Sequence, residues 1–438
     1  MESTRRQFLK NSLAAAAGTG LASLMPQARA RASANDRLTV GLIGCRNMGF
    51  ANLKGFLKFP DTACAALCDV DAGVLSERAA EVEKMTGKKP KIYADFRDLI
   101  ENRDIDAVIV GTPDHWHCLP LVMACQAGKD VYVEKPLANS IAECGVMLRA
   151  ARRYDRIVQV GQQQRSGAHW QEAIRFVQSG KLGSIRRVRF WANFNYGAGQ
   201  PAVPDEPVPA GVDFDMWLGP APARTFNKNR FHGLWRLFWD YGGGLMTDWG
   251  VHLIDMGLWA MKISGPPKST VSTGGIYASS GNALETADTQ NVLWESGDFA
   301  MEWEHNAGVQ TGPYGRNYGV LFLGTNGTLV ADRDSWEVIA EGWEPERRME
   351  PVQPVKSDNL DHDNHVRNFI DCVKTRQRPA CDIETGRLAA LYAHLGNIAY
   401  RTGRKVVWSD SKNGFINDAE ADILAVPLYR KPWELPKI

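Results

Sequence analysis

The chain has 438 residues, of which 44% are hydrophobic and 23% are charged. This length is typical of two or three domains, and the apolar fraction excludes a disordered or collagen-like chain. With 51 basic and 50 acidic residues, the formal charge of +1 provides no field that would attract nucleic acid or an anionic membrane.

The N-terminus shows the order of features that is typical of an export signal. Arg5 and Arg6 precede an Ala-, Gly- and Leu-rich stretch at 12–25, and small residues that suit cleavage follow at 28–34. A paired arginine, a weakly apolar run and a cleavage site resemble a twin-arginine signal. We therefore expect the Tat export machinery to recognise residues 1–34, which predicts a periplasmic or secreted protein with no membrane segment in its mature form.

The eight cysteines predict free thiols. None lies in a C-x-x-C pair or in a Cys/His spacing that would suit zinc. Because a chain that folds before export has no early access to oxidising chemistry, we interpret these cysteines as mostly buried thiols. The run at 361–365, which holds two aspartates and two histidines, is interpreted as a helix start with acids at its positive end. No metal is expected.

A dinucleotide-binding turn is predicted after the first strand. An apolar run from Leu38 ends at Gly44, and a helical pattern follows from about residue 48 to 59. This strand–turn–helix context is what a G-x-G-x-x-G fingerprint needs, because N–H groups at the helix N-terminus face the pyrophosphate. The second glycine is replaced by Arg46, which could pair with a phosphate or point to solvent.

An acid after the second strand bears on the choice of cofactor. The strand predicted at 63–68 runs into Asp69, which lies 25 residues after Gly44. A carboxylate there accepts hydrogen bonds from the ribose hydroxyls of NAD and repels the 2′-phosphate of NADP. We therefore expect NAD as the cofactor, with NADP possible because Arg46 would favour a phosphate.

Strands then alternate with helices. The segments 106–113 and 130–133 are continuously apolar, and a helix predicted at 119–127 joins them. Strands of this kind belong to a buried parallel sheet with right-handed crossovers. Residues 35–160 therefore predict a doubly wound Rossmann domain, whose ligands lie at the carboxyl ends of the strands.

Several motifs, taken in order, resemble those of the Gfo/Idh/MocA oxidoreductase family. They are the glycine-rich turn at 44–49, the run T-P-D-H-W-H at 112–117, E-K-P at 134–136, and a triple glycine at 242–244 followed by Asp248 and His252. The resemblance spans roughly residues 37 to 410. It implies an α/β fold in which the Rossmann domain is followed, at 161–438, by an α/β domain with an open, largely antiparallel sheet. The family commonly uses the outer face of that sheet in oligomer contacts, so a homo-oligomer, dimer or tetramer, is expected.

The same resemblance assigns the catalytic and cofactor residues. Asp248 and His252 are four residues apart, a spacing that puts both side chains on one face of a helix. Lys135 and His252 are assigned to proton transfer and hydroxyl orientation, and Asp248 to substrate contact and pKa tuning; which of the first two is the general base stays open. The cofactor is assigned to Gly44, Arg46, Asn47, Met48, Gly49, Asp69, Thr112, Pro113, His117, Glu134 and Lys135.

Two further segments are expected to contact the substrate. Polar amides and an arginine at a strand end suit sugar hydroxyls, although a solvated loop would have the same composition. A histidine and an arginine among aromatic residues, just before the triple glycine, suit a carbohydrate pocket, although core aromatics would explain part of this segment. The expected contacts are Gln164, Arg165, His232, Arg236 and Tyr241.

Three functions follow from these motifs. The leading one is an exported NAD(P)-dependent oxidoreductase that acts on CH–OH groups and transfers hydride between a tightly bound nicotinamide cofactor and a sugar or cyclic polyol. The second is an NAD-dependent glycosidase that oxidises a ring carbon transiently, eliminates the aglycone and returns the hydride. The third is a non-catalytic periplasmic sugar-binding protein, against which the retained Lys135, Asp248 and His252 argue.

Overall fold

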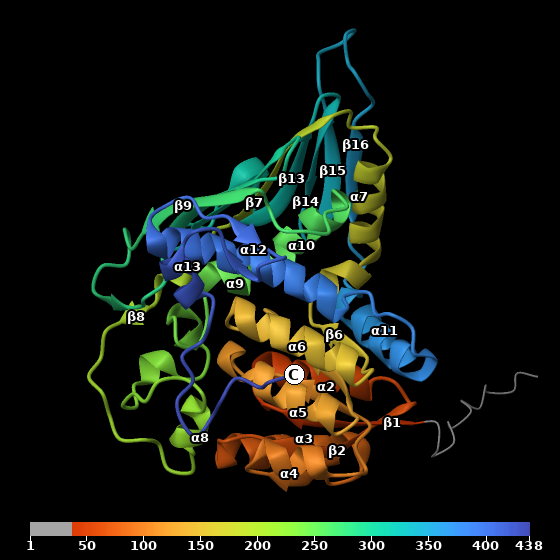
Figure 1. Cartoon of the computed structure of the whole chain (residues 1–438). Helices are drawn as coiled ribbons and strands as arrows, with labels where there is room; N and C mark the ends of the chain where they lie inside the picture. Colours follow the sequence, from red (N-terminus) through yellow and green to blue (C-terminus); the bar gives the residue numbers. More distant parts are fainter. Residues whose placement is uncertain (1–36) are drawn as a thin grey trace, which may run out of the picture. The chain divides into compact units, whose positions relative to one another are not determined.

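The computed structural model describes residues 37–438 (Figure 1). The predicted export signal at 1–34 lies outside the described residues. None of the helices in the described part of the chain is both long and apolar enough to cross a membrane.

The first sheet is parallel and has six strands in the order β3-β2-β1-β4-β5-β6. Its strands are β1 (Leu38–Ile43), β2 (Thr62–Cys68), β3 (Lys91–Tyr93), β4 (Ala107–Val110), β5 (Asp130–Val133) and β6 (Val158–Val160). The helices between them are α2 (Asn47–Leu57), α3 (Ala72–Thr86), α4 (Phe96–Glu101), α5 (Cys118–Gln126) and α6 (Ile141–Arg153). The strand order reverses between β1 and β4, which is the point where a doubly wound sheet opens a crevice for ligands. The predicted Rossmann fold is confirmed.

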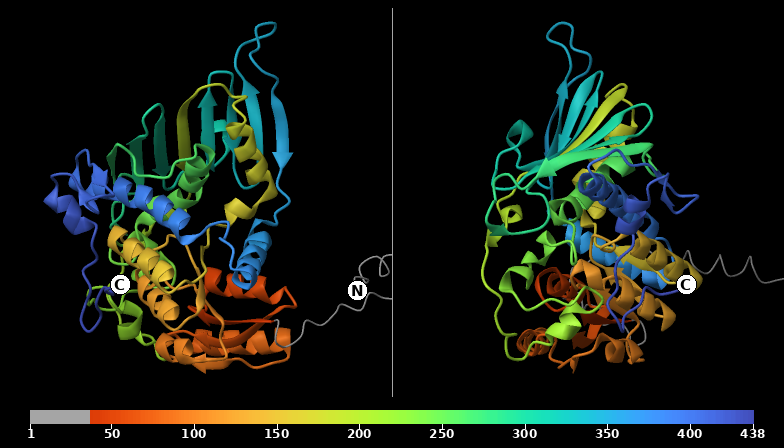
Figure 2. Two further views of the ribbon diagram at one scale, coloured as in Figure 1. Left: turned by 45° about the vertical axis from the view of Figure 1, so that its right-hand side comes forward. Right: turned by 60° about the vertical axis from the view of Figure 1, so that its left-hand side comes forward.

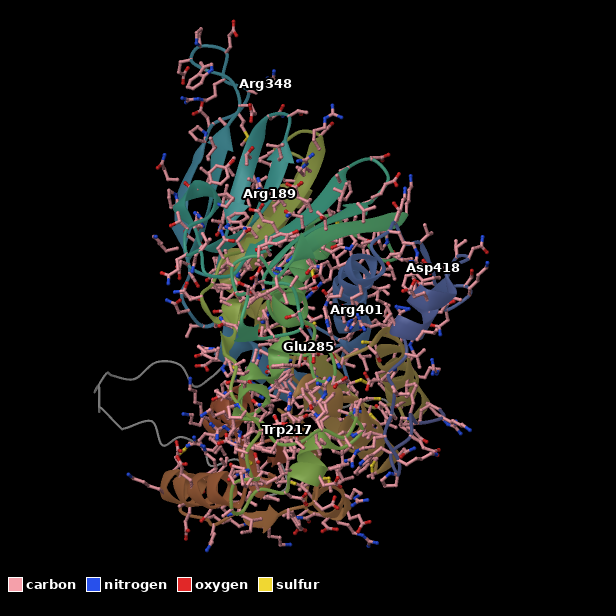
Figure 3. All side chains as sticks on the ribbon, turned by 90° about the vertical axis from the view of Figure 1, so that its left-hand side faces the viewer. Arg189, Trp217, Glu285, Arg348, Arg401 and Asp418 are labelled. Atoms are coloured by element: carbon pink, nitrogen blue, oxygen red, sulfur yellow. The ribbon has the colours of Figure 1, made fainter. Side chains whose placement is uncertain are left out.

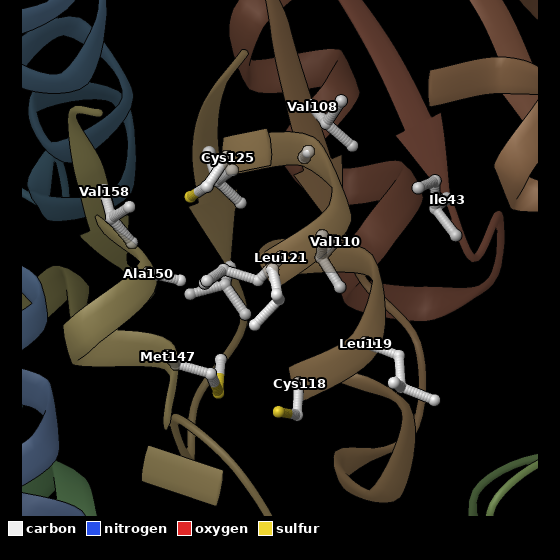
Figure 4. Packing of buried hydrophobic residues seen from close by; sticks show 14 of the residues in the cluster. Ile43, Val108, Val110, Cys118, Leu119, Leu121, Cys125, Met147, Ala150 and Val158 are labelled. Atoms are coloured by element: carbon white, nitrogen blue, oxygen red, sulfur yellow. The ribbon is translucent and has the colours of Figure 1, made fainter. Parts of the chain in front are cut away.

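Apolar side chains on both faces hold this sheet between its helices. All four residues of β4 are buried, which explains the continuously apolar sequence there. Figure 4 shows Val108 and Val110 of β4 packed against Leu121 of α5, with Met147 of α6 beside them. The parallel sheet is therefore a rigid support for the loops at the carboxyl ends of its strands.

The second sheet has eight strands in the order β16-β15-β14-β13-β7-β12-β11-β9. They are β7 (Ile185–Ala192), β9 (Ser269–Gly275), β11 (Thr289–Glu295), β12 (Ala300–Asn306), β13 (Tyr318–Gly324), β14 (Gly327–Ala331), β15 (Ser335–Ala340) and β16 (Val352–Lys356). Every neighbouring pair is antiparallel except β7 with β12. The expected open, largely antiparallel sheet is thus confirmed.

Helices cover one face of this second sheet. They are α7 (Ala168–Gln178), α10 (Gly250–Ala260) and α12 (Ile383–Thr402), and Figures 1 and 2 show them on the side that faces the parallel sheet. On β11 the residues alternate between buried and exposed, as expected for a strand with a single covered face. Leu293 and Ile339, which are 41% and 44% exposed, lie on the face that no helix of residues 37–438 covers.

The chain returns to the Rossmann domain near its end. Helix α11 (Asp361–Thr375) begins at the predicted helix start and packs on α2. The C-terminal segment, residues 426–438, follows α13 (Ala419–Leu424) and lies against α4, α6 and the loop after β4. In this segment Trp433 contacts the ring of Trp116, with centroids 4.9 Å apart.

Other short elements are α8 (Phe214–Leu218), α9 (Gly244–Asp248), β8 (Gln200–Pro201), β10 (Asn282–Ala283), β17 (Trp408–Ser409) and β18 (Gly414–Phe415).

The cysteines have the state that their spacing predicts. All eight are buried and free, and six of them lie on β2, α5, α6 or the turn between β1 and α2. Burial raises the pKa of Cys64 and Cys125 to about 12, which keeps both thiols protonated. These thiols therefore act as small apolar core residues.

Candidate active site

The glycine-rich turn joins β1 to α2 at a very close backbone approach. A Cβ atom at Gly49 would lie 2.1 Å from the carbonyl oxygen of Gly44, so no side chain fits there. Gly44 itself has φ +86, a conformation that favours glycine. Arg46, at the position of the missing second glycine, has φ −97 in the extended region, which any residue adopts without strain. The imperfect fingerprint therefore still forms the turn.

Asp69 follows β2 and ties the turn in place. Its carboxylate accepts hydrogen bonds from the backbone N–H of Cys45 at 2.7 Å and from that of Asp71 at 3.0 Å. Burial raises the pKa of Asp69, while these two hydrogen bonds oppose the shift.

A cavity of about 1070 Å³, including the space at its open mouth, lies above this turn. Nine of the residues predicted to bind the cofactor line it: Gly44, Arg46, Asn47, Met48, Asp69, Thr112, Pro113, Glu134 and Lys135. The remaining walls include aromatic residues from both halves of the chain, namely Phe96, Trp116, Trp217 and Trp235. The structure therefore brings the strand ends β1, β2, β4 and β5 together around one space.

His117 does not line this cavity. Its Nδ1 lies 2.8 Å from the carbonyl oxygen of Pro136 and its Nε2 lies 3.0 Å from that of Thr112. The ring therefore braces the loops that follow β4 and β5. Glu134 is held in a similar way, because its Oε1 accepts a hydrogen bond of 2.7 Å from Asn52 on α2.

Three donors converge on Asp248 at the end of α9. Lys135 Nζ lies 2.5 Å from Asp248 Oδ1, Arg236 Nε donates to the same oxygen at 3.1 Å, and the Tyr196 hydroxyl donates to Oδ2 at 2.7 Å. Burial alone would raise the pKa of Asp248, but the charges of Lys135 and Arg236 outweigh it and hold that pKa well below its usual range. Asp248 is therefore an ionised carboxylate.

His252 lies one helical turn further, on α10, and is only 4% exposed. Its Nδ1 is buried and has no hydrogen-bond partner within residues 37–438. Burial lowers the pKa of His252 well below 6.5, and the positive charges of Arg333 and Lys135 lower it further. The imidazole is therefore neutral at pH 7, close to the pair that Lys135 forms with Asp248.

The residues expected to contact a sugar divide into two groups. Arg236 and His232 line the cavity, and His232 Nε2 lies 3.0 Å from Asp71 Oδ2, on the side of the second strand. Gln164 is fully buried and donates from Nε2 to the backbone oxygen of His252 at 3.4 Å. Of these three residues, His232 and Arg236 therefore line the cavity, and Gln164 contacts the backbone of His252 without lining it.

The other two expected substrate contacts lie elsewhere. Arg165 forms a two-oxygen ion pair with Asp255, at 2.7–3.0 Å, and its guanidinium packs on Trp259. Tyr241 is fully buried in an aromatic cluster, with its ring centroid 4.9 Å from that of Trp217, and does not line the cavity.

Four residues of this site are absent from the sequence-based assignment: Asp114, Tyr196, Trp249 and Arg333. Asp114 lies within the T-P-D-H-W-H motif and lines the cavity, so the motif itself could have indicated it. Tyr196 belongs to an irregular loop and Arg333 to a turn between β14 and β15, and neither has a local pattern that marks it. Within the described residues, no group of three or more His, Cys, Asp or Glu side chains is arranged to hold a metal ion.

Known proteins resemble this chain in sequence and in fold. A glycosyl hydrolase family 109 protein of Shewanella baltica is 28% identical over 201 residues, which is 41% of this chain and 44% of that protein. The chain thus matches less than half the length of this relative. Two solved structures each align with 85% of the chain at a TM-score of 0.64. One is a levoglucosan dehydrogenase in complex with NADH and levoglucosan (18% identity, 99% of its length), and the other an aldose–aldose oxidoreductase from Caulobacter crescentus (20%, 100%).

The two domains also match the two parts of one protein family. Residues 38–162 match the NAD-binding Rossmann fold of the Gfo/Idh/MocA oxidoreductases. Residues 168–263 and 352–435 match the C-terminal α/β domain of the same family. Together these matches cover more than half of the chain, in the order and with the sheets that the structure has. The protein therefore belongs to the Gfo/Idh/MocA oxidoreductase family and carries its NAD-binding Rossmann domain.

Proposed function

We propose that this protein is an exported oxidoreductase that uses a tightly held NAD(P) to oxidise or reduce one carbon of a sugar or cyclic polyol. The observation that carries the proposal is the contact of Lys135 with Asp248, at the wall of the same cavity that the Gly44 turn closes. A cofactor cradle and a lysine–carboxylate–histidine group in one space are what the oxidation of an alcohol requires.

The cofactor cradle fits a dinucleotide by its shape. The close approach of Gly49 to Gly44 packs the N-terminus of α2 against the turn, and a helix N-terminus in this place suits a pyrophosphate. Arg46 and Asn47 would hold the phosphates, and Asp69 the adenosine ribose. When bound, the nicotinamide accepts hydride from the carbon and returns it. The Asp69 carboxylate favours NAD over NADP in this proposal.

Lys135, His252 and Asp248 have different roles in the proposed proton transfer. Lys135, held in place by Asp248, would donate a hydrogen bond to the substrate oxygen and fix the reacting hydroxyl. His252 is neutral at pH 7, so its imidazole is the group that takes the hydroxyl proton as hydride leaves the carbon. Asp248 also keeps the negative charge that balances Lys135 and Arg236.

The cofactor experiment tests this proposal first. Purified protein is denatured, and the released dinucleotide is identified together with its redox state. We expect about one NAD or NADH per chain, and bound nicotinamide absorbance near 340 nm that changes when a substrate sugar is added. Protein that releases no dinucleotide, and binds none on addition, would contradict both the cofactor assignment and the tight binding.

Export supports tight binding, because free dinucleotide is scarce outside the cytoplasm. An exported enzyme therefore regenerates its cofactor on a second sugar or returns the hydride to the first. Lys10 and the pair Arg5–Arg6 precede the apolar stretch of the proposed signal. A fusion of residues 1–36 to a reporter should leave the cytoplasm through the Tat machinery, and an R5K/R6K variant should remain inside.

A second candidate function is an NAD-dependent glycosidase, favoured by the similarity to a glycosyl hydrolase family 109 protein. Transient oxidation acidifies the neighbouring C–H, the aglycone leaves, water adds and hydride returns, so no net oxidation occurs. Loaded protein incubated with aryl glycosides separates the two functions. Release of phenol with an unchanged final NADH content would replace net oxidoreduction by glycoside cleavage. A non-catalytic sugar-binding protein would give neither signal.

The open face of the eight-stranded sheet is proposed as an oligomer contact. Val271, Leu293, Leu323 and Ile339 expose apolar side chains on or beside it. Ion pairs of Arg187 with Glu302 and of Arg189 with Glu304 lie among them. Light scattering of the purified protein should give a dimer or tetramer, and L293D should dissociate it.

A further inference from the structure

Arg333, in the turn between β14 and β15, has a guanidinium group that the protein leaves mostly unpaired. Its Nε donates to Gln164 Oε1 at 3.2 Å, and its guanidinium carbon lies 4.5 Å from the ring centroid of Trp249. A guanidinium has five N–H donors. Across residues 37–438, neither terminal nitrogen has a hydrogen-bond partner, and no carboxylate lies within 4.0 Å of the group. Four donors are therefore available to a ligand.

This unpaired state distinguishes Arg333 from comparable arginines of the same domain. Arg316, which is similarly shielded from solvent, lies 2.9 Å from Asp332 and 2.6 Å from Glu337. Arg165 is paired with Asp255. Removing a guanidinium from water without an anion is unfavourable, and burial lowers the pKa of Arg333. A group kept in this state is best explained by an anion that arrives with the substrate.

The guanidinium belongs to the same site as the proposed catalytic residues. Trp249, against which it packs, follows Asp248 directly and lies 6.0 Å from His252 between ring centroids. Phe194 and Tyr318 flank Trp249 at 4.5 and 4.8 Å. Gln164 links the two sides, because it accepts from Arg333 and donates to the backbone of His252. An aromatic wall with polar groups on either side of it suits a sugar ring.

The charges around this space leave a positive excess. Lys135, Arg236 and Arg333 contribute three cations, and Asp248 is in direct contact with the first two alone. Asp114 is 4% exposed, and burial raises its pKa well above the usual value against the opposing charges of Arg236 and Lys135, which favours its neutral form. His252 is neutral as well. Asp361 and Asp248 act on Arg333 only from beyond contact distance.

We propose that the substrate is an acidic sugar, whose carboxylate pairs with Arg333 while its reacting hydroxyl lies between Lys135 and His252. This proposal rests on the proposed function and names its substrate class. The two terminal nitrogens of Arg333 form a planar fork, which matches the two oxygens of a carboxylate, as in a uronic acid or its glycoside. Gln164 and Trp249 fix the plane of that fork.

Binding measurements test the proposal independently of turnover. The cofactor-loaded protein is titrated calorimetrically with D-glucuronate and D-galacturonate, and in parallel with D-glucose and D-galactose. We expect each acid to bind at least tenfold tighter than its neutral counterpart. R333M should remove this preference and R333K should keep part of it, while both variants retain the thermal stability and the dinucleotide content of the parent protein. A change that lowers acid and neutral binding equally would overturn the proposal.

The matched control is Arg348→Met. Arg348 lies at the end of the loop between β15 and β16, well away from Trp217 of the cavity wall, and donates only to the backbone oxygen of Thr325 (Figure 3). R348M removes the same charge and should keep the full preference for acids. D-glucose 6-sulfate and D-glucose 6-phosphate form two further arms. If only these esters bind through Arg333, the carboxylate assignment is overturned.

Failure of this proposal and failure of the proposed function give different results. Acids that bind through Arg333 without any hydride transfer or glycoside cleavage would reject the enzymatic function and retain the acidic ligand. Neutral sugars that are turned over equally well by the parent protein and by R333M would retain the oxidoreductase and reject the acidic substrate.

Discussion

At the residue scale, Asp248 is the centre of the proposed site. Lys135, Arg236 and Tyr196 all donate hydrogen bonds to its two carboxylate oxygens. The carboxylate is thereby fixed in orientation and in charge. Both cations depend on it, since no other carboxylate among residues 37–438 forms an ion pair with Lys135 or Arg236. Removing this one charge therefore changes the state of the whole group.

Asp248→Asn should separate the electrostatic role of this carboxylate from its shape. The variant leaves two mostly buried cations without an anion, so we expect kcat/KM to fall about 100-fold or more and the free energy of unfolding to fall by about 3 kcal/mol. Substrate kinetics and urea unfolding measure both effects. The control is D240N, which breaks the Arg224–Asp240 ion pair away from the cavity lining and should lower stability alone.

The pH dependence of kcat/KM should report the neutral state of His252. A histidine with an ordinary pKa would lose its proton-accepting form as pH falls through about 6.5. Because burial and two nearby cations lower the pKa of His252, the acid side of the profile should begin below pH 6.5. H252N should abolish that limb together with most activity. A limb centred at 6.5 or above in the parent protein would assign proton transfer to another group.

The proposed catalytic residues were accessible to sequence reasoning because short motifs carry them. Lys135 belongs to the E-K-P motif after a buried strand, and Asp248 and His252 follow the triple glycine four residues apart, although the structure divides them between α9 and α10. Sequence reasoning could not tell which arginine is free to bind a substrate. Arg165 is paired with Asp255, and Arg333 contacts Gln164 and no carboxylate of residues 37–438. Both sets of contacts join residues 90 or more positions apart, and no local pattern encodes them.

At the scale of the elements, the turn between β1 and α2 has no room for side chains at its glycines. Gly49 approaches the backbone of Gly44, and a Cβ at Gly111 would lie 2.4 Å from the Cα of Gly49. Two strand ends and the first turn of α2 thus meet without any side chain between them. Sequence reasoning predicted this turn despite Arg46, because only the first and last glycines are sterically required.

Gly49→Ala should disturb the turn from within. The new methyl group collides with the Gly44 carbonyl, so we expect a loss of about 1–3 kcal/mol in the free energy of unfolding and at least a tenfold loss of dinucleotide affinity. Thermal melts and dinucleotide titration measure the two effects. Gly265→Ala is the control, since a Cβ there meets nothing within 4 Å. Equal behaviour of the two variants would show that the close approach is relaxed in solution.

Helix α6 and the C-terminal segment share a buried carboxyl. Glu143 accepts hydrogen bonds from Tyr429 at 2.7 Å and from Ser140 at 2.8 Å, and burial raises the pKa of Glu143 to about 7. Below pH 4.5 the group is protonated in both the folded and unfolded states. Between pH 4.5 and about 7 the unfolded chain releases its proton first, so stability falls as pH rises, by up to about 3 kcal/mol.

Glu143→Gln should therefore flatten the pH dependence of stability between pH 5 and 8. The amide oxygen can accept from one of the two hydroxyls and the NH2 group can donate to the other, and the amide has no charge to bury, so the variant should be more stable than the parent protein at pH 8. Urea unfolding at several pH values provides the comparison. Glu83→Gln, at an exposed position of α3, should leave the parent profile unchanged.

At the scale of the whole molecule, residues 37–438 form one compact unit although they contain two sheets. The chain crosses back to the Rossmann domain through α11, where Arg367 and Lys374 both contact Asp61 and Asp363 contacts Lys58. Helix α12 then packs against both β9 and α6. Sequence reasoning divided the chain near residue 160 and could not detect this return, because the contacts join positions about 300 residues apart.

The described part of the chain should unfold in a single cooperative transition. Calorimetry of the full chain should give equal calorimetric and van't Hoff enthalpies, and a dinucleotide at 100 times its Kd should stabilise that one transition by about 2.7 kcal/mol. Two resolved transitions, with only the first one shifted by the dinucleotide, would mean that the sheets are energetically independent. R367M tests the link directly and should lower cooperativity if α11 couples the two sheets.

The last residues of the chain have a consequence for the order in which the cofactor site can form. Trp433 packs against Trp116 and stacks on Phe96, and both of those rings line the cavity. A ribosome delivers Phe96 and Trp116 more than 300 residues before Trp433. The two rings that line the cavity therefore gain this packing only once a segment far along the chain has folded against them. Binding of a dinucleotide to the proposed cradle would accordingly come late in folding.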